Sequence, residues 1–189
     1  NDGSYAWYIK STTTLGPTAK IKIVDADHSY GLSVLSDAFR TKGALTVQLP
    51  TGATDLVAGV ASTVQWQRFG SLVGVNVYYS EDDGATYYTS CVSPGAAGNA
   101  IACNRDFVSD TDSLSWQPPQ TVISKLDTTP TKGYKIKVAD KNDATVFGVG
   151  PEFTVKGQLT VTAPTTNPVW QIGQTPDITW DLTQGNIQN

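Results

Sequence analysis

The sequence contains no methionine, only one histidine and only two cysteines among its 189 residues. Because a translated chain begins with methionine, this absence predicts that the chain is a processed or truncated piece. A Ser-His-Asp nucleophilic site would have to use His28, and no G-x-S-x-G element accompanies this residue. We therefore expect His28 to be a surface histidine, and we predict that the protein is not an enzyme.

Clustered positive charge and long apolar runs are also missing. Acidic residues outnumber basic ones, which gives a formal net charge of −4, and the basic residues are scattered along the chain. A nucleic-acid surface would need a clustered positive footprint, so we expect no nucleic-acid partner. No apolar run approaches the roughly 18–20 residues that a membrane span requires, so we also expect no membrane span.

Short segments with period-two alternation are what the sequence does have, together with abundant Thr, Gly, Ser and Val. Such alternation is typical of half-buried strands, and no helical periodicity is visible. We predict an all-β fold with Trp66 and Trp116 as the core of a two-sheet sandwich. The predicted strands cover residues 5–9, 19–24, 38–41, 44–49, 63–67, 74–80, 86–90, 113–117, 132–139, 152–156, 159–162 and 177–181.

An internal repeat organises the chain. Residues 39–66 recur 114 positions later as residues 153–180, with ten identities in 28 gap-free positions. Trp, Gly and Pro are among the identities, and chance matches are least expected at these residues. Further upstream, residues 4–7 match residues 113–116, and residues 20–23 match residues 135–138. The identical pairs are Phe39/Phe153, Lys42/Lys156, Gly43/Gly157, Leu45/Leu159, Thr46/Thr160, Val47/Val161, Pro50/Pro164, Thr51/Thr165, Gly59/Gly173 and Trp66/Trp180.

The repeat predicts three parts: residues 1–43 are the C-terminal half of a module, residues 44–157 are a complete module, and residues 158–189 are the N-terminal part of a further module. Trp7 and Trp180 would then be core residues of the two partial modules. Half a sandwich cannot cover its inner face, so we expect both ends to contact a neighbouring module or subunit. The expected contact residues are Tyr5, Trp7, Trp170, Ile178 and Trp180.

Three explanations of the incomplete ends stay open. Neighbouring copies could complete each other, as in strand-complemented fibres; the chain could be a window on a longer tandem array; or it could be an expression fragment. A composite of the two ends would lack the counterpart of about residues 75–109, which favours the array over complementation. In either case, head-to-tail association produces a fibre instead of a closed ring.

Cys91 and Cys103 flank a Gly/Ala-rich loop. Two cysteines cannot build a CxxC-type metal site by themselves, and no histidine lies near them in sequence. We predict that a disulfide closes the loop, which would imply an oxidising compartment. Two separate thiols are the alternative.

Two kinds of polar turn carry further expectations. Residues 80–87 fit the pattern S-x-D-x-G-x-T-aromatic and resemble an Asp-box hairpin, in which side chains bond to the turn backbone. We expect this turn to be structural. Four acidic turns could bind calcium, but none has the spacing of an EF-hand loop. We therefore expect solvated turns, and we assign no cofactor and no metal site. These turns hold Asp25/Asp27, Asp82/Asp83, Asp110/Asp112 and Asp140/Asp143.

The start of the third module, with Leu159, Pro164, Trp170, Gly173 and Trp180, resembles the Ig-like repeats of Ser/Thr-rich, GPI-anchored fungal cell-wall proteins. That group includes the family implicated in β-1,6-glucan assembly, and similar tandem modules occur in bacterial and archaeal surface proteins. The resemblance implies tandem immunoglobulin-like or fibronectin III-like β-sandwiches. It carries over no catalytic residue, and the complete module has Leu56 where the third module has Trp170.

We therefore expect a structural, extracellular repeat protein that forms a fibre, stalk or surface filament at the cell surface. Its partners would be copies of itself or adjacent modules of the same polypeptide. The alternative is a glycan-binding or adhesive cell-wall module, in which exposed aromatic residues stack on sugar rings. The candidate aromatic residues are Tyr8, Tyr78 and Tyr88.

Overall fold

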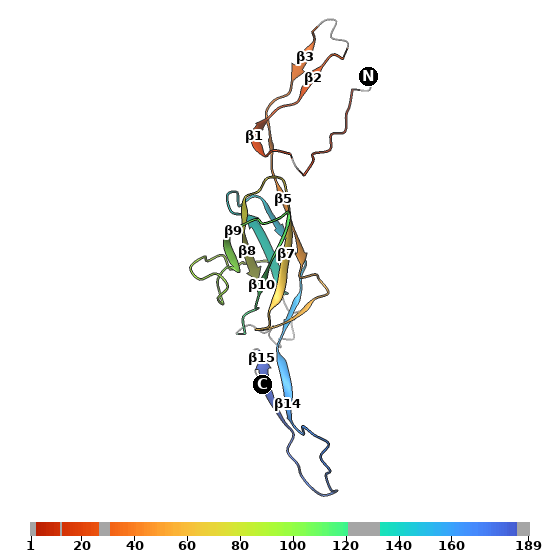
Figure 1. The fold of residues 1–189 in the computed structure, drawn as a ribbon, viewed down its shortest axis with the longest axis vertical. Helices are drawn as coiled ribbons and strands as arrows, with labels where there is room; N and C mark the ends of the chain where they lie inside the picture. Colours follow the sequence, from red (N-terminus) through yellow and green to blue (C-terminus); the bar gives the residue numbers. More distant parts are fainter. Residues whose placement is uncertain (1–2, 12, 27–30, 121–132, 185–189) are drawn as a thin grey trace.

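The computed structural model of the protein describes residues 3–11, 13–26, 31–120 and 133–184. These residues form fifteen β-strands and no helix, so the predicted all-β fold is confirmed. The molecule is elongated (Figure 1). A central body of packed strands, residues 44–157, lies between an N-terminal arm (residues 3–43) and a C-terminal arm (residues 158–184), which point in opposite directions.

Most strands are short. The body contains β5 (Ala44–Leu49), β6 (Asp55–Val57), β7 (Ser62–Phe69), β8 (Gly74–Ser80), β9 (Ala102–Asp106), β10 (Thr111–Trp116), β11 (Lys135–Asp140), β12 (Phe147–Val149) and β13 (Thr154–Lys156). The N-terminal arm contains β1 (Gly16–Ala19), β2 (Lys22–Val24), β3 (Ser33–Leu35) and β4 (Phe39–Thr41). The C-terminal arm is the hairpin of β14 (Gln158–Ala163) and β15 (Thr179–Gln184).

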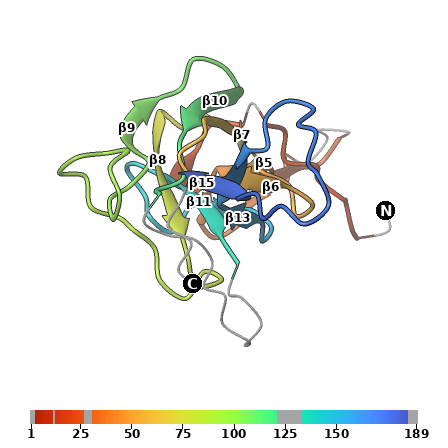
Figure 2. The ribbon, with the colours of Figure 1, turned by 90° about the horizontal axis from the view of Figure 1, so that it is seen from below.

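Two antiparallel sheets form the body. One has the strand order β10-β7-β5 and the other β12-β11-β8-β9, while β13 pairs with β6 in parallel. Seen along the long axis, β10, β7 and β5 lie on one side and β9, β8 and β11 on the other (Figure 2). Alternate side chains of both sheets enter one common core, as in the β-sandwich class. The core includes Leu45, Val47, Val64, Trp66, Val75, Val77, Tyr79, Trp116, Ile136 and Val138.

Aromatic contacts connect the two sheets. Trp116 of β10 lies 5.3 Å from Tyr79 of β8 between ring centroids, and it meets Phe153 edge-on at 6.5 Å. Trp66 of β7 is fully buried, and the guanidinium of Arg105 lies 5.8 Å from its ring. Offset and edge-on aromatic pairs stabilise a core beyond the area that they bury. Both tryptophans predicted for the complete module therefore lie in its core.

Several predicted strands are wrong. Residues 5–9 and 86–90 form no strand, and Tyr88 makes only an isolated bridge with Tyr79. The strand predicted over residues 19–24 is divided, since β1 ends at Ala19 and β2 begins at Lys22, and Ile23 in it is exposed. An alternating pattern becomes a strand only where another strand supplies hydrogen bonds, and none pairs with residues 5–9 in the described part of the chain.

The hairpin of the C-terminal arm pairs like β5 and β7 of the body. Val47 lies opposite Trp66 in β5 and β7, and Val161 lies opposite Trp180 in β14 and β15. Each of these residues has its counterpart 114 positions along the chain. The same correspondence holds for the pairs Leu45/Arg68, Thr46/Gln67 and Leu49/Gln65 against Leu159/Leu182, Thr160/Asp181 and Ala163/Thr179.

The N-terminal arm pairs like β11, β12 and the start of β13. Ile23 lies opposite Val34 in β2 and β3, and Val138 lies opposite Gly148 in β11 and β12. Val138 lies 115 positions after Ile23, and Gly148 lies 114 positions after Val34. Ala19 opposite Phe39 likewise corresponds to Tyr134 opposite Phe153. Each arm therefore repeats a different part of the strand pairing of the body.

Replacement of Trp66 by alanine tests the role of the shared core. We expect Trp66→Ala to lower the free energy of unfolding by about 3–5 kcal/mol, because it leaves a cavity between the two sheets. Denaturant titration followed by circular dichroism measures this change. Val108→Ala is the control, since Val108 is 86% exposed, and its effect should stay within about 0.5 kcal/mol. Equal effects of the two variants would contradict a core centred on Trp66.

Candidate functional site

The C-terminal arm exposes one apolar face. Val161 and Trp180 are 60% and 61% exposed, whereas their counterparts Val47 and Trp66 in the body are 8% and 0% exposed. In the body, β11 and β12 contact β5, and Val47 and Trp66 pack in one core with side chains of the opposite sheet. The hairpin has no such second layer in the described part of the chain, and its apolar side chains face solvent. Leu159, Trp170, Ile178 and Leu182 are exposed on the same arm.

The N-terminal arm exposes a second apolar surface. Ile21 and Ile23 are largely exposed, although their counterparts Ile136 and Val138 are fully buried in the body. Val34 and Leu35 on β3 and Tyr5 and Ile9 nearer the chain start are exposed as well.

Trp7 and Trp180, predicted as core residues of the partial modules, are 48% and 61% exposed. Trp7 meets Phe39 edge-on at 6.1 Å, much as Trp116 meets Phe153. A two-stranded hairpin can bury an apolar face only against another layer, so Trp180 remains largely in solvent. Trp7 lies outside any strand and is half-exposed. The five predicted contact residues thus all lie exposed on the two arms, three on one arm and two on the other.

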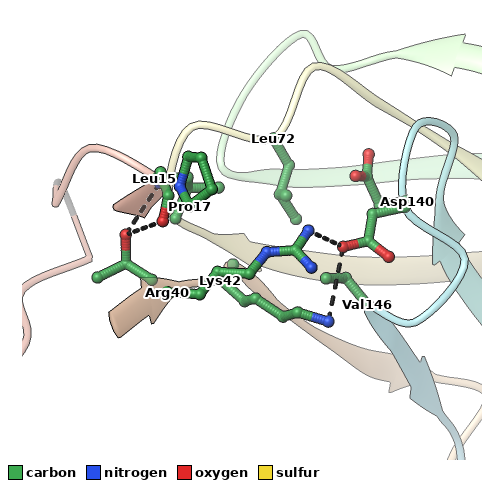
Figure 3. A pocket seen from close by; sticks show the side chains of 11 residues that line it. Leu15, Pro17, Arg40, Lys42, Leu72, Asp140 and Val146 are labelled. Carbon is green, nitrogen blue, oxygen red and sulfur yellow. Dashed lines mark hydrogen bonds and ion pairs between the residues drawn. The ribbon is translucent and has the colours of Figure 1, made fainter. Parts of the chain in front are cut away.

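A hollow of about 290 Å³ lies where the N-terminal arm meets the body (Figure 3). Leu15 of the arm packs against the edge of the core, and Leu72 and Val146 of the body line the other side. Next to it, the backbone N–H of Gly70 donates a hydrogen bond to the carbonyl of Ser11 at 2.8 Å. The arm is therefore joined to the body by apolar packing and by a backbone hydrogen bond.

An ion-pair cluster closes the same junction. Arg40 of β4 lies 2.7 Å from the carboxylate of Asp143, between Nη2 and Oδ2, and Lys42 lies 3.6 Å from the same oxygen. The side chains of Arg40 and Lys42 extend in the same direction in Figure 3, and both pair with this carboxylate. Hydrogen bonds from the hydroxyl and backbone N–H of Thr145, together with the two positive charges, lower the pKa of Asp143. Residues of the arm thus bind the turn between β11 and β12 electrostatically.

Several carboxylates of the predicted acidic turns form ion pairs, and Asp27 lies outside the described residues. Asp83 pairs with Lys135 at 2.7 Å, and Asp110 pairs with Arg68 at 3.1 Å. Asp140 is buried beside the junction hollow, and among the described residues its Oδ1 has no hydrogen-bond partner. Within the described ranges, no group of three or more His, Cys, Asp or Glu side chains could hold a metal ion.

The turn after β8 forms the predicted Asp-box hydrogen bonds. Ser80 Oγ donates to Asp82 Oδ1 at 2.7 Å and accepts the N–H of Gly84 at 2.8 Å. Thr86 donates its N–H to Asp82 Oδ1 at 2.8 Å and its hydroxyl to Asp82 Oδ2 at 2.6 Å. Gly84 has a φ of 85°, which favours glycine. The predicted structural role of this turn is confirmed.

Cys91 and Cys103 form the predicted disulfide, which closes the loop between β8 and β9. The N–H of Gly98 in this loop donates to the hydroxyl of Tyr79 at 2.9 Å, which connects the loop to the core. Burial raises the pKa of Tyr79 to about 12. The loop is thus held at its ends by a covalent bond and in its middle by a core tyrosine.

The aromatic residues considered for sugar stacking do not share one surface. Tyr88 packs on Tyr79 at 4.7 Å and donates its hydroxyl to Glu81 at 3.1 Å. Tyr78 is half-buried on β8, opposite Lys137, and Tyr8 is exposed on the N-terminal arm. His28 lies outside the described residues.

No protein-family model matches the chain, and no curated protein matches it. In the part of the chain that the structure describes, no helix is long and apolar enough to cross a membrane. The repeat predicted that both ends would lack a covering layer and would contact a neighbouring unit, whereas nothing in the sequence predicted the junction between the N-terminal arm and the body. The pairing of Arg40 with Asp143 had no local signal, because the two residues are 103 positions apart.

Removal of the Asp143 charge should loosen the N-terminal arm. We expect Asp143→Asn to speed hydrogen exchange at the amide of Gly70, which donates across the junction. Because the pKa of Asp143 is lowered from its ordinary value of 3.8, its contribution is complete above that pH and is lost as the pH falls through the lowered pKa. Added salt should weaken it as well.

The control for this variant is Asp110→Asn, which breaks an ion pair within the body. It should leave the exchange of Gly70 unchanged. Equal exchange of the Gly70 amide in Asp143→Asn and the unmodified chain would contradict an electrostatic junction.

Proposed function

We propose that the protein is a structural, non-enzymatic component of an extracellular fibre, stalk or surface filament. It would be built from tandem Ig-like β-sandwich modules that associate head to tail. The observation that carries this proposal is the shared pairing register of β5–β7 and β14–β15, together with the exposure of residues whose counterparts are buried.

The strand order supports an Ig-like module. A three-stranded sheet packs on a four-stranded sheet within residues 44–157. In addition, β13, near the end of this segment in sequence, pairs in parallel with β6, near its beginning. In this interpretation, residues 158–189 begin a further module with the counterparts of β5 and β7. Residues 1–43 end another module with the counterparts of β11, β12 and β13. The two partial modules flank the complete one.

The arrangement of the arms supports a fibre. The apolar surfaces lie at opposite ends of an elongated molecule and differ from each other (Figure 1). Association through two different surfaces is heterologous, so it continues in one direction unless its rotation closes a ring. The junction between the N-terminal arm and the body is an example of such a contact. It combines an apolar hollow with ion pairs between the arm and the body.

The titratable groups favour a structural role over catalysis. The pKa values of Tyr79, Tyr134 and Glu81 are raised, first of all by burial. Tyr79 and Tyr134 are buried in the core, and Glu81 accepts a hydrogen bond from the hydroxyl of Tyr88, which packs against that core. The disulfide supports an oxidising compartment, which is consistent with the extracellular location that we propose.

Negative-stain electron microscopy over a range of concentrations tests this function, with intact mass measured on the same sample. We expect rods that lengthen with concentration and that consist of chains near 20.1 kDa. Rods made of a much larger polypeptide in material from the source organism would support the same function through a covalent array. Compact particles of one chain at every concentration and in the native material would contradict it.

A further inference from the structure

A second hollow lies beside the first, where the N-terminal arm meets the body. It has a volume of about 390 Å³, and its walls include Tyr8 and Lys10 of the arm, Lys42 after β4, and Phe69 at the end of β7. We call it the lysine hollow. Ligand sites are commonly concave, enclose about 300–1,000 Å³ and combine apolar walls with a few polar groups. The lysine hollow has this size and this mixture of side chains.

Aromatic side chains at the lysine hollow are exposed. Tyr8 is 80% exposed and Phe69 is 37% exposed. Ser11 and Thr13 bring hydroxyl groups to the same wall. Apolar side chains that are rimmed by polar groups at a surface mark a ligand-binding groove. A sugar fits such a groove, because its ring has an apolar C–H face that packs on an aromatic ring and hydroxyl groups at its edge.

The charged side chains at the lysine hollow are basic. Lys10 is exposed and forms no ion pair with the described residues. Lys42 lies 3.6 Å from Asp143, but Arg40 pairs with the same carboxylate oxygen at the shorter distance of 2.7 Å. Among the described residues, no acidic side chain lines this hollow. It is therefore a positive site in a chain whose net charge is −4, and it favours an anionic ligand.

The backbone holds the wall of the hollow in place. The N–H of Thr13 donates to the carbonyl of Lys10 at 2.9 Å, and the N–H of Gly70 donates to the carbonyl of Ser11 at 2.8 Å. Gly70 has a φ of 87°, and a Cβ atom there would lie 2.9 Å from Leu15 Cδ2. The arm segment is thus ordered before a ligand arrives, which lowers the entropic cost of binding.

The framework of the sandwich does not require these side chains. The sequence match between the segment before Tyr8 and β10, continued without a gap, pairs Tyr8 with Gln117 and Lys10 with Pro119. The complete module therefore forms with neither a tyrosine nor a lysine at these two positions. The aromatic and basic character of the hollow is particular to this junction.

We propose that the lysine hollow binds an acidic polysaccharide through one of its uronate residues. The sugar ring packs against Tyr8 and Phe69, and its carboxylate accepts charge-assisted hydrogen bonds from the ammonium groups of Lys10 and Lys42. The proposal goes beyond the proposed function and does not depend on association between chains. It adds to a surface filament a site that holds an acidic glycan.

Titration calorimetry with oligogalacturonate, a linear uronate oligomer, tests this site at low protein concentration. We expect Lys10→Gln to weaken binding roughly five- to tenfold, because a charge-assisted contact is lost. Tyr8→Ala should weaken it by a similar factor through loss of the ring contact, and Lys10→Arg, which keeps the charge, should retain it. Added salt should weaken binding by the unmodified chain.

The matched controls are Lys20→Gln and Tyr5→Ala, which change exposed residues of the same arm outside the hollow. Both should bind like the unmodified chain. An equal loss in Lys20→Gln and Lys10→Gln would assign binding to the overall charge of the arm and would overturn the site.

Two further probes separate the charge from the sugar. Neutral dextran and polyglutamate should both bind much more weakly than oligogalacturonate. Equal binding of dextran would overturn the role of the lysines, and equal binding of polyglutamate or full affinity in Tyr8→Ala would overturn the sugar contact. Absence of oligogalacturonate binding by the unmodified chain would overturn the proposal as a whole, and each of these results would leave the proposed filament intact.

Discussion

Coverage of the apolar face of the β5–β7 pair by the opposite sheet is the interaction on which the structure depends. Val47 lies on β5, which β11 and β12 contact, and Trp66 is fully buried in the core that both sheets share. Trp116 joins the two sheets through Tyr79. Burial of side chains of this size contributes roughly 1.5–3 kcal/mol each. The hairpin of β14 and β15 has the same pairing register without the covering layer, and Trp180 is exposed. Pairing within a hairpin is therefore local, whereas burial of its face requires a second layer.

Close packing at the junction requires glycine at position 43, between the N-terminal arm and the body. A Cβ atom at Gly43 would lie 2.6 Å from Leu72 Cδ2 and 2.9 Å from the carbonyl oxygen of Phe69. Only glycine allows this close approach. The arm is then held beside the body by Leu15 and by the ion pairs of Asp143. Successive units in a tandem arrangement can thus be stiff without an extended interface.

The sequence predicted the strands that carry a strong alternating pattern between clear turns. The bounds of β5 and β8 match the prediction, since Pro50 ends one and the acidic Asp-box turn follows the other. The short strands β3, β6, β9 and β12 were missed, because they depend on partner strands and have little pattern of their own. The predicted strand at residues 5–9 is wrong for the same reason. The disulfide and the Asp-box turn were predictable because their residues are close in sequence, unlike Arg40 and Asp143.

The environment of Trp180 tests the central claim, which is that a neighbouring unit completes each arm. The chain would be labelled with 5-fluorotryptophan, and the fluorine signals compared in water and deuterium oxide at low and high concentration. We expect Trp66 and Trp116 to show no solvent isotope shift at any concentration, because both are buried. Trp180 should show the shift in dilute solution and lose it as chains associate. A Trp180 signal that keeps its full solvent shift in the associated sample would contradict the account.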